Sequence, residues 1–327
     1  MHYFAACDSI GGIASIFRGA NSKPKYKERP YADIWEDNAL NVLFVSNSTC
    51  QFFTDELYGI FAAAGLEDVT LALVYYGGCS VRQHYEWSQD KTVANYQLRI
   101  IDKNGLGVTS DYSLDRALDY ARWDVISFDN NAKTFGSGKV ETALGITEPY
   151  FGQLLSYIKE KYPDARYLWH EVWANDIGYS APSFKVETAE KRTSIFKAKQ
   201  GVMYHMMETY GIGGVPTGDA WEKVRDLPLF TTPLPEFTGV TRFALTSRIA
   251  NGEFKDDYSH DGDVGGGQYL NACVWFEILS GRSCVGNTFR PKYQYKGHDV
   301  SLTDEKTAIL QNAAHEAVEE FKKSIAE

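Results

Sequence analysis

The sequence predicts one α/β domain in which helices cover both faces of a central, mainly parallel sheet of five strands, a three-layer α/β/α sandwich. Short apolar runs with the composition of buried strands alternate along the chain with longer amphipathic helical patterns. Clusters of small polar residues follow several of these runs, where a strand would end and its crossover connection begin. At 327 residues the chain is long enough for one large domain, and no change of composition divides it.

The first strand pattern, at residues 42–45, carries the most informative junction. Its consecutive apolar residues run into Ser46-Asn47-Ser48-Thr49, and an amphipathic helical pattern follows over residues 51–65. This order places the Ser48 hydroxyl at the carboxyl end of a strand, beside the N-terminus of a helix, where open α/β sheets bind ligands. Because serine is also an ordinary helix cap, this stretch alone leaves a structural role open.

The remaining elements follow in chain order. We expect further strands at residues 69–76, 123–128 and 165–173, with a short fifth strand near 214–218. We expect further helices at residues 113–122, 146–161, 188–210, 265–279 and 303–326. The turn signal Lys103-Asn104-Gly105 predicts a small hairpin inserted near residues 85–110. Residues 1–39 lack a strong period, and we expect an irregular arm packed on a domain formed by residues 40–327.

Charge and cysteine content narrow the possible partners. A net charge of −10 without any basic run disfavours nucleic acid and anionic membranes, and favours a small-molecule or carbohydrate substrate. The five cysteines contain no CxxC pair and leave one over, so we expect mostly buried thiols rather than a zinc site or a disulfide framework. They are Cys7, Cys50, Cys79, Cys273 and Cys284.

The hydropathy and the N-terminal residues indicate where in the cell the protein is expected. No apolar run reaches membrane-spanning length, and residues 1–19 lack the basic start and apolar centre of a signal peptide. We therefore expect a soluble chain, either cytoplasmic or, if a leader has been removed, secreted or periplasmic.

Several polar residues together predict a serine hydrolase. Ser48, Gly78 and either Asn130 or Asn131 stand at predicted strand ends, and Asp257-x-x-His260 lies in a late loop. A serine hydroxyl becomes an effective nucleophile when a histidine takes its proton, and an aspartate fixes the histidine tautomer. Backbone N–H groups and an asparagine amide would stabilise the oxyanion of the tetrahedral intermediate. This chemistry requires neither a metal nor an organic cofactor.

These motifs also carry a family resemblance. The chain resembles the SGNH hydrolases, or GDSL-type esterases, in particular a bacterial branch whose first motif reads G-N-S-F. The Asn47-Ser48 pair, residues 75–79, the strand at 123–126 and Asp257-x-x-His260 follow the family's order, and residues 266–277 look like the branch's final helix. The resemblance covers about residues 40–286. It implies a flavodoxin-like strand order and ester hydrolysis, with a short acyl group on a carbohydrate as the family-level substrate.

Carried over residue by residue, the resemblance implies Ser48 as nucleophile, His260 as base and Asp257 as the partner that orients it. Ser48, Gly78 and Asn130 (or Asn131) would form the oxyanion hole. Two positions depart from the pattern: Ser46 stands where the family usually has glycine, and Thr49 where it usually has an apolar residue. A side chain at position 46 can crowd the turn that presents Ser48, so the sequence leaves open whether these two residues reduce activity.

Six further residues are candidates for substrate binding, each with an ordinary structural role as the alternative: Asn47, Arg82, His84, Asp129, His170 and Glu171. Three other functions stay open. Glu171 and Asp176 would suit a glycosidase. Residues 46–49 at a helix N-terminus would suit a flavodoxin-like protein that binds a phosphate or glycoside ligand. Finally, an inactive family member would bind carbohydrate only.

Overall fold

The computed structural model describes residues 31–232 and 243–326. In this part of the chain, seven strands form the main sheet in the order β4-β3-β2-β1-β5-β6-β9. Their bounds are Ala39–Ser46 (β1), Asp68–Tyr75 (β2), Tyr96–Asp102 (β3), Gly105–Tyr112 (β4), Val125–Phe128 (β5), Arg166–His170 (β6) and Gly213–Val215 (β9). The strands β2, β1, β5, β6 and β9 run parallel to one another, in the flavodoxin-like order. The predicted fold class is confirmed.

The two additional strands come from the predicted hairpin. β3 pairs antiparallel with β2, and β4 pairs antiparallel with β3, so the hairpin extends the sheet at one edge. Its turn uses Gly105, whose φ of +92° lies in the left-handed region that glycine adopts easily. The five predicted parallel strands therefore belong to a sheet of seven.

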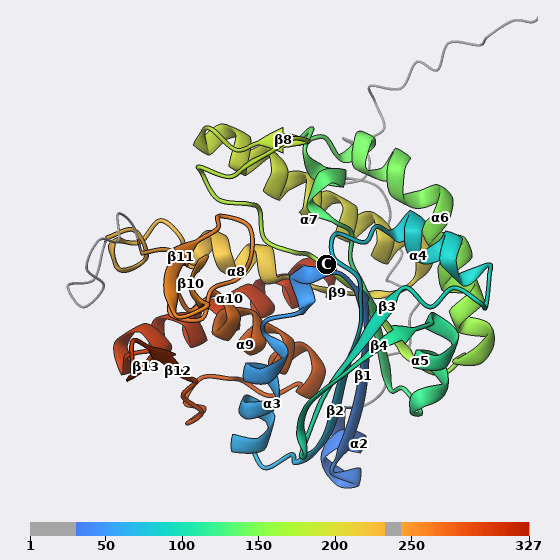
Figure 1. The fold of residues 1–327 in the computed structure, drawn as a ribbon, viewed down its shortest axis with the longest axis horizontal. Helices are drawn as coiled ribbons and strands as arrows, with labels where there is room; N and C mark the ends of the chain where they lie inside the picture. Colours follow the sequence, from blue (N-terminus) through green and yellow to red (C-terminus); the bar gives the residue numbers. More distant parts are fainter. Residues whose placement is uncertain (1–30, 233–242, 327) are drawn as a thin grey trace, which may run out of the picture.

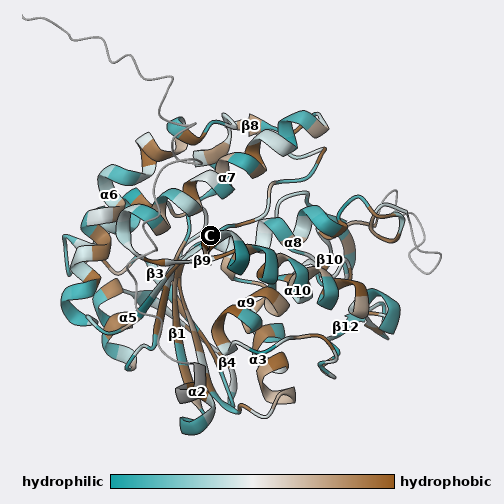
Figure 2. Ribbon diagram, turned by 180° about the vertical axis from the view of Figure 1, so that it is seen from behind, coloured by the Kyte–Doolittle hydropathy of each residue, from teal (hydrophilic) through white to brown (hydrophobic). Residues whose placement is uncertain are grey.

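Helices cover both faces of this sheet (Figure 1). One layer holds α4 (Val81–Ser88), α5 (Leu114–Tyr120), α6 (Val140–Lys161) and α7 (Ala189–Tyr210). The other layer holds α3 (Thr54–Ala63), α8 (Thr217–Val224), α9 (Gly267–Ser280) and α10 (Asp304–Ala326). In Figure 2 the hydrophilic colour of α6 and α10 lies on their outer sides, as expected of helices that pack one face on a core.

Short elements complete the described chain. They are α2 (Tyr31–Asp37), the 3-10 helices η1 (Ser48–Cys50), η2 (Ala132–Phe135) and η3 (Pro228–Phe230), and the hairpins β7 (Ser180–Ala181) with β8 (Phe184–Lys185), β10 (Ser247–Ala250) with β11 (Glu253–Asp256), and β12 (Lys292–Tyr295) with β13 (His298–Ser301). Of the predicted arm at residues 1–39, residues 1–30 lie outside the described ranges and Tyr31–Asp37 is helical. None of the helices in the two described ranges combines the length and the apolar surface that a membrane span requires.

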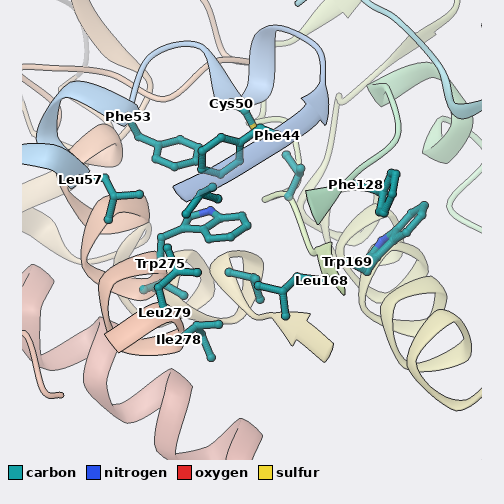
Figure 3. Packing of buried hydrophobic residues seen from close by; sticks show 14 of the residues in the cluster. Phe44, Cys50, Phe53, Leu57, Phe128, Leu168, Trp169, Trp275, Ile278 and Leu279 are labelled. Carbon is teal, nitrogen blue, oxygen red and sulfur yellow. The ribbon is translucent and has the colours of Figure 1, made fainter. Parts of the chain in front are cut away.

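Helix α9 is the centre of the core. All of its residues from Gly267 to Ser280 are buried, which explains why its apolar residues are distributed around the whole helix. The Trp275 ring lies against Phe44 of β1 and Phe53 before α3, with ring centroids 5.0 and 6.0 Å apart (Figure 3). Trp275 also contacts His170 at the end of β6, at 5.2 Å. One helix thus fixes the first strand, the chain that enters α3 and the end of β6 relative to one another.

Truncating this central side chain should destabilise the fold. We expect Trp275→Ala to lower the free energy of unfolding by about 3–5 kcal/mol, because it opens a cavity among aromatic rings. The Trp275 Nε1 atom has no hydrogen-bond partner, so Trp275→Phe, which keeps most of the ring contact, should lose clearly less. Urea unfolding followed by circular dichroism measures both variants. Equal losses for the two would contradict this account of the core.

Candidate functional site

The turn after β1 presents Ser48. Asn47 caps η1 through its side-chain oxygen, which accepts a hydrogen bond from the Thr49 N–H at 3.1 Å. The Asn47 amide donates to the carbonyl of Cys79 at 3.3 Å and to Asp129 Oδ1 at 3.2 Å. Cys79 follows β2 and Asp129 follows β5, so one side chain joins the carboxyl ends of three adjacent strands around the serine.

The two departures from the family pattern are accommodated in this turn. Ser46 is the last residue of β1, in register with Tyr75 of β2, and its small side chain is buried. The Thr49 hydroxyl donates a hydrogen bond to Asp129. Ser46 therefore pairs with β2 as an ordinary strand residue. Thr49 adds a second hydrogen bond, besides that of Asn47, to the residue that follows β5.

His260 lies next to Ser48. Its Nε2 atom is 3.0 Å from Ser48 Oγ, and its Nδ1 atom is 3.1 Å from Asp257 Oδ2. The Asp257 carboxylate also accepts the backbone N–H groups of Ser259 at 3.2 Å and His260 at 2.9 Å. Asp257 fixes both the loop and the imidazole ring, and the Nδ1–H···Oδ2 hydrogen bond leaves the Nε2 lone pair directed at the serine hydroxyl.

Charge holds Asp257 in its ionised form. The Arg248 guanidinium of β10 lies 2.8 Å from Asp257 Oδ2. Burial alone would raise the pKa of Asp257, but hydrogen bonds and charge from His260, together with the charge of Arg248, lower it to about 2. Phe52 packs edge-on against the His260 ring, with centroids 5.4 Å apart, and lies beneath the Arg248 guanidinium. These contacts restrict the imidazole from two sides.

The loop that carries His260 is tied to the chain after β6. The Trp173 Nε1–H donates to the carbonyl of Ser259 at 3.0 Å, and the Asp176 N–H donates to the carbonyl of Tyr258 at 2.7 Å. Tyr258 has a φ of +60°, an unusual conformation that these bonds support. The position of His260 therefore depends on a segment more than eighty positions away in the sequence.

A pocket of about 180 Å³ opens beside the serine. Ser48, His260, Gly78 and Asn131 all line it, so the structure brings together residues from four separate predicted motifs. Gly78 has a φ of +68°, and its carbonyl accepts a hydrogen bond from the Asn131 amide at 2.9 Å. Within the described chain, neither the Ser48 N–H nor the Gly78 N–H is bonded to an acceptor.

Asn130 is placed differently from Asn131. Its amide donates to the hydroxyl of Thr147 at 2.8 Å, and its oxygen accepts the N–H groups of Val81 at 3.3 Å and Asn131 at 2.9 Å. The side chain is buried and does not line the pocket. Of the two asparagines that the sequence left open, Asn131 is the one at the pocket, and Asn130 connects β5 to α4 and α6.

Two predicted substrate contacts lie away from the pocket. Arg82 is exposed on α4 and pairs with Glu86 one turn later, at 2.7 Å. His84 is buried, stacks on Tyr96 and lies 3.0 Å from its hydroxyl. Burial lowers the pKa of His84 to about 3, so it is a neutral core residue. Neither side chain is placed to contact a ligand beside Ser48.

Three other predicted contacts lie beneath the turn rather than on the pocket surface. His170 Nδ1 is 3.5 Å from Cys50 Sγ, and that sulfur is 4.0 Å from Asp129 Oδ2. Burial lowers the pKa of His170 to about 3 and raises the pKa of Asp129 to about 6. Burial likewise raises the pKa of Glu171 well above its usual value, which disfavours a role as an ionised nucleophile. The predicted glycosidase pair is further weakened because Asp176 is buried beside Arg192.

Cys50, Asp129 and His170 have the side-chain types of a metal site, and all three are buried. Their hydrogen bonds indicate another arrangement. Thr217 donates its hydroxyl proton to the Glu171 carbonyl at 2.6 Å, so His170 Nε2–H donates to Thr217 Oγ1 at 2.9 Å. This leaves His170 Nδ1 as the acceptor for the Cys50 thiol. The group therefore forms a closed hydrogen-bond network behind the turn. The four described cysteines are buried and unpaired, and Cys7 lies outside the described residues.

Some pocket residues were not identified as site residues from the sequence. They are Lys133 of η2, Trp173 and Asn175 after β6, Tyr179, and Lys199 of α7. Lys199 lies on the face of α7 that also carries Ile195 and Val202, both buried. A lysine on the apolar face of a helix was the available signal. A larger surface hollow of about 450 Å³, bounded by Tyr85 and Glu148, has no histidine or cysteine among its described lining residues.

Comparison with known proteins gives a family and a set of related folds. The model of the family described as "Domain of unknown function (DUF4886)" matches residues 41–317. A DUF4886 family protein from Bacteroides uniformis has a similar structure, with a TM-score of 0.66 and 21% identity over 86% of this chain and 95% of its own. No curated protein matches the sequence.

More distant similarities are weaker. A lipase from a goat rumen metagenome has a TM-score of 0.43 and 9% identity, over 74% of this chain and 98% of its own. A catalytic mutant of an acetylxylan esterase from Geobacillus stearothermophilus has a TM-score of 0.42 and 12% identity, over 75% of this chain and 95% of its own.

The charge on Asp257 should appear in the pH dependence of stability. Its pKa is about 2 in the folded protein, below the unfolded value of about 3.9. The Asp257 carboxylate therefore stabilises the fold fully at pH values above its pKa in the unfolded chain. This contribution is lost as the pH falls through the folded-state pKa of about 2. The difference in free energy of unfolding between wild type and Asp257→Asn should therefore shrink as the pH falls from about 4 towards about 2. Urea unfolding at several pH values measures it, and a difference independent of pH would contradict the assignment.

Proposed function

The chain belongs to the DUF4886 family, and we propose that it is a serine esterase acting through an acyl-enzyme. The observation that supports this most directly is the continuous series of contacts from Ser48 Oγ through His260 to Asp257, with distances of 3.0 and 3.1 Å, at the edge of a pocket. The three side chains have the chemical types and the order of contact that nucleophilic acyl transfer requires.

The proposed reaction proceeds in two halves. His260 Nε2 takes the Ser48 proton as Oγ attacks the ester carbonyl carbon, and the tetrahedral intermediate expels the alcohol, which receives that proton from His260. A water then loses a proton to His260 and attacks the acyl-serine, which releases the acid and restores Ser48. Asp257 holds the tautomer and stabilises the imidazolium that forms in each half.

Three donors are available to the oxyanion. The N–H groups of Ser48 and Gly78 are free of acceptors within the described chain, and the Asn131 amide, bonded to the Gly78 carbonyl, lines the same pocket. Such a set of fixed donors stabilises developing negative charge without reorganisation.

The size of the pocket bears on the acyl group. A volume of about 180 Å³ is small beside the several hundred Å³ of typical ligand pockets. We propose a short acyl group such as acetyl. Trp173 and Tyr179 line the pocket, and aromatic side chains of this kind suit a carbohydrate alcohol.

The central test is hydrolysis of p-nitrophenyl acetate. We expect Ser48→Ala and His260→Ala to lower kcat/KM by at least about ten-thousandfold, because each removes a member of the acyl-transfer unit. Two control variants should retain activity: Ser156→Ala, at an exposed serine of α6, and His205→Ala, which loses contacts to Glu148 and Thr209 away from the pocket.

Active-site labelling provides a second readout. A fluorophosphonate probe should label Ser48 in the wild type and leave Ser48→Ala unlabelled. A folded wild-type protein that neither hydrolyses the ester nor reacts with the probe would overturn the esterase proposal and favour a protein that only binds its ligand.

The oxyanion donors predict a separate kinetic effect. Asn131→Asp keeps an oxygen that can cap η2 but replaces the amide donor with a carboxylate, so we expect kcat to fall by about a hundredfold or more with little change in KM. Steady-state kinetics with circular dichroism as the fold check measure this. Unchanged kcat in the folded variant would remove Asn131 from the oxyanion hole.

A further inference from the structure

The pocket has the opposite charge to the protein as a whole. The chain has a net charge of −10, yet the charged side chains that line the pocket beside Ser48 are Lys133 and Lys199. None of its described lining residues is an aspartate or a glutamate. In a small pocket, where water is partly excluded, two lysines without a carboxylate create a field that favours an anion.

Lys199 is the more unusual of the two. It projects from α7, its side chain is 3% exposed, and Nζ donates a hydrogen bond to the Trp173 carbonyl at 2.7 Å. Nζ also lies 5.2 Å from the centroid of the Phe135 ring. An ammonium has three donors, and within the described residues Lys199 forms no salt bridge. A buried ammonium without a salt-bridge partner is costly, so this geometry favours an anionic ligand next to Nζ.

The ionisation of Lys199 agrees with this geometry. Burial lowers the pKa of Lys199 to about 7, against the opposing charges of Asp129 and Glu171. Burial raises the pKa of both carboxyl groups, to about 6 for Asp129 and well above its usual value for Glu171, and within the described residues neither forms a salt bridge with Lys199. A carboxylate bound next to Nζ would favour the ammonium form and give it a direct ion-pair partner.

We propose that the natural substrate is an ester carrying a carboxylate group, which Lys199 binds through charge-assisted hydrogen bonds while Lys133 adds a second positive charge. This inference rests on the proposed esterase function and narrows its substrate to anionic esters. Lys199 acts here as a specificity-determining residue: it binds the charged part of the substrate and takes no part in the proton transfers.

The test compares matched charged and neutral esters on the wild-type protein. p-Nitrophenyl hemisuccinate and its methyl ester differ by a charge on the acyl side, and 4-acetoxyphenylacetate and its methyl ester differ by a charge on the alcohol side. We expect a preference in kcat/KM of about tenfold or more for the charged member of one pair, because a hydrogen bond to a charged group contributes substantially to binding. Equal values in both pairs would overturn the inference while leaving the esterase proposal intact.

Variants assign the preference to particular residues. Lys199→Met should lower the charged-to-neutral ratio of kcat/KM by about tenfold to a hundredfold, mainly through KM. Lys133→Met should lower it less, since Lys133 is exposed and water screens its charge. Lys197→Met, an exposed lysine of the same helix outside the pocket, is the matched control and should keep the wild-type ratio. If Lys199→Met does not fold, Lys133→Met, at an exposed position, provides the test. An unchanged charged-to-neutral ratio of kcat/KM in that variant would count against the inference.

A binding experiment separates the two proposals. Calorimetric titration of the wild type and of Ser48→Ala with succinate and with uncharged succinamide requires no catalysis. Binding of succinate alone, without hydrolysis of any ester, would retain the anion site and overturn the esterase. Ester hydrolysis with no charge preference and no succinate binding would retain the esterase proposal and overturn the anion site.

Discussion

The hydrogen bond between His260 Nε2 and Ser48 Oγ joins residues 212 positions apart, and most of the site geometry depends on that contact. Neither partner is placed by its neighbours in sequence alone. Ser48 is held where β1 ends, through Asn47 and its bonds to the chain after β2 and β5. His260 is held by Asp257 and by the chain after β6, through Trp173. The parallel sheet brings these points together because the carboxyl ends of its strands share one edge.

Helix α9 packs against the strands that form this edge of the sheet and fixes their positions. Its Trp275 ring contacts β1 through Phe44 and the end of β6 through His170, so the strand that carries the nucleophile and the segment that supports the base share one packing element. A helix buried on all sides tolerates little displacement, since the core is close-packed. Core packing therefore holds the ends of β1 and β6, to which the Ser48 turn and the His260 loop are hydrogen-bonded or joined.

A buried polar layer lies between this core and the pocket. Cys50, Asp129 and His170 satisfy one another and their neighbours by hydrogen bonds. In a region of low dielectric, such groups favour one arrangement strongly, because any alternative leaves a polar atom unpaired. Lys199 differs from them, since it lines the pocket and its ammonium donates a hydrogen bond to the Trp173 carbonyl but forms no salt bridge within the described residues.

The sequence by itself determined the parallel strands, the hairpin and the proximity of Asp257 to His260, because these follow from periodicity, turn residues and a spacing of one turn. Only the tertiary structure decided between Asn130 and Asn131. Both follow β5, but the former is used by Thr147 and Val81 while the latter faces the pocket. The tertiary structure alone also shows that His170 is buried and that Lys199 of α7 lines the pocket. Local patterns record which residues share a strand or helix face, whereas contacts between such faces depend on how the layers pack, and one sequence cannot specify that locally.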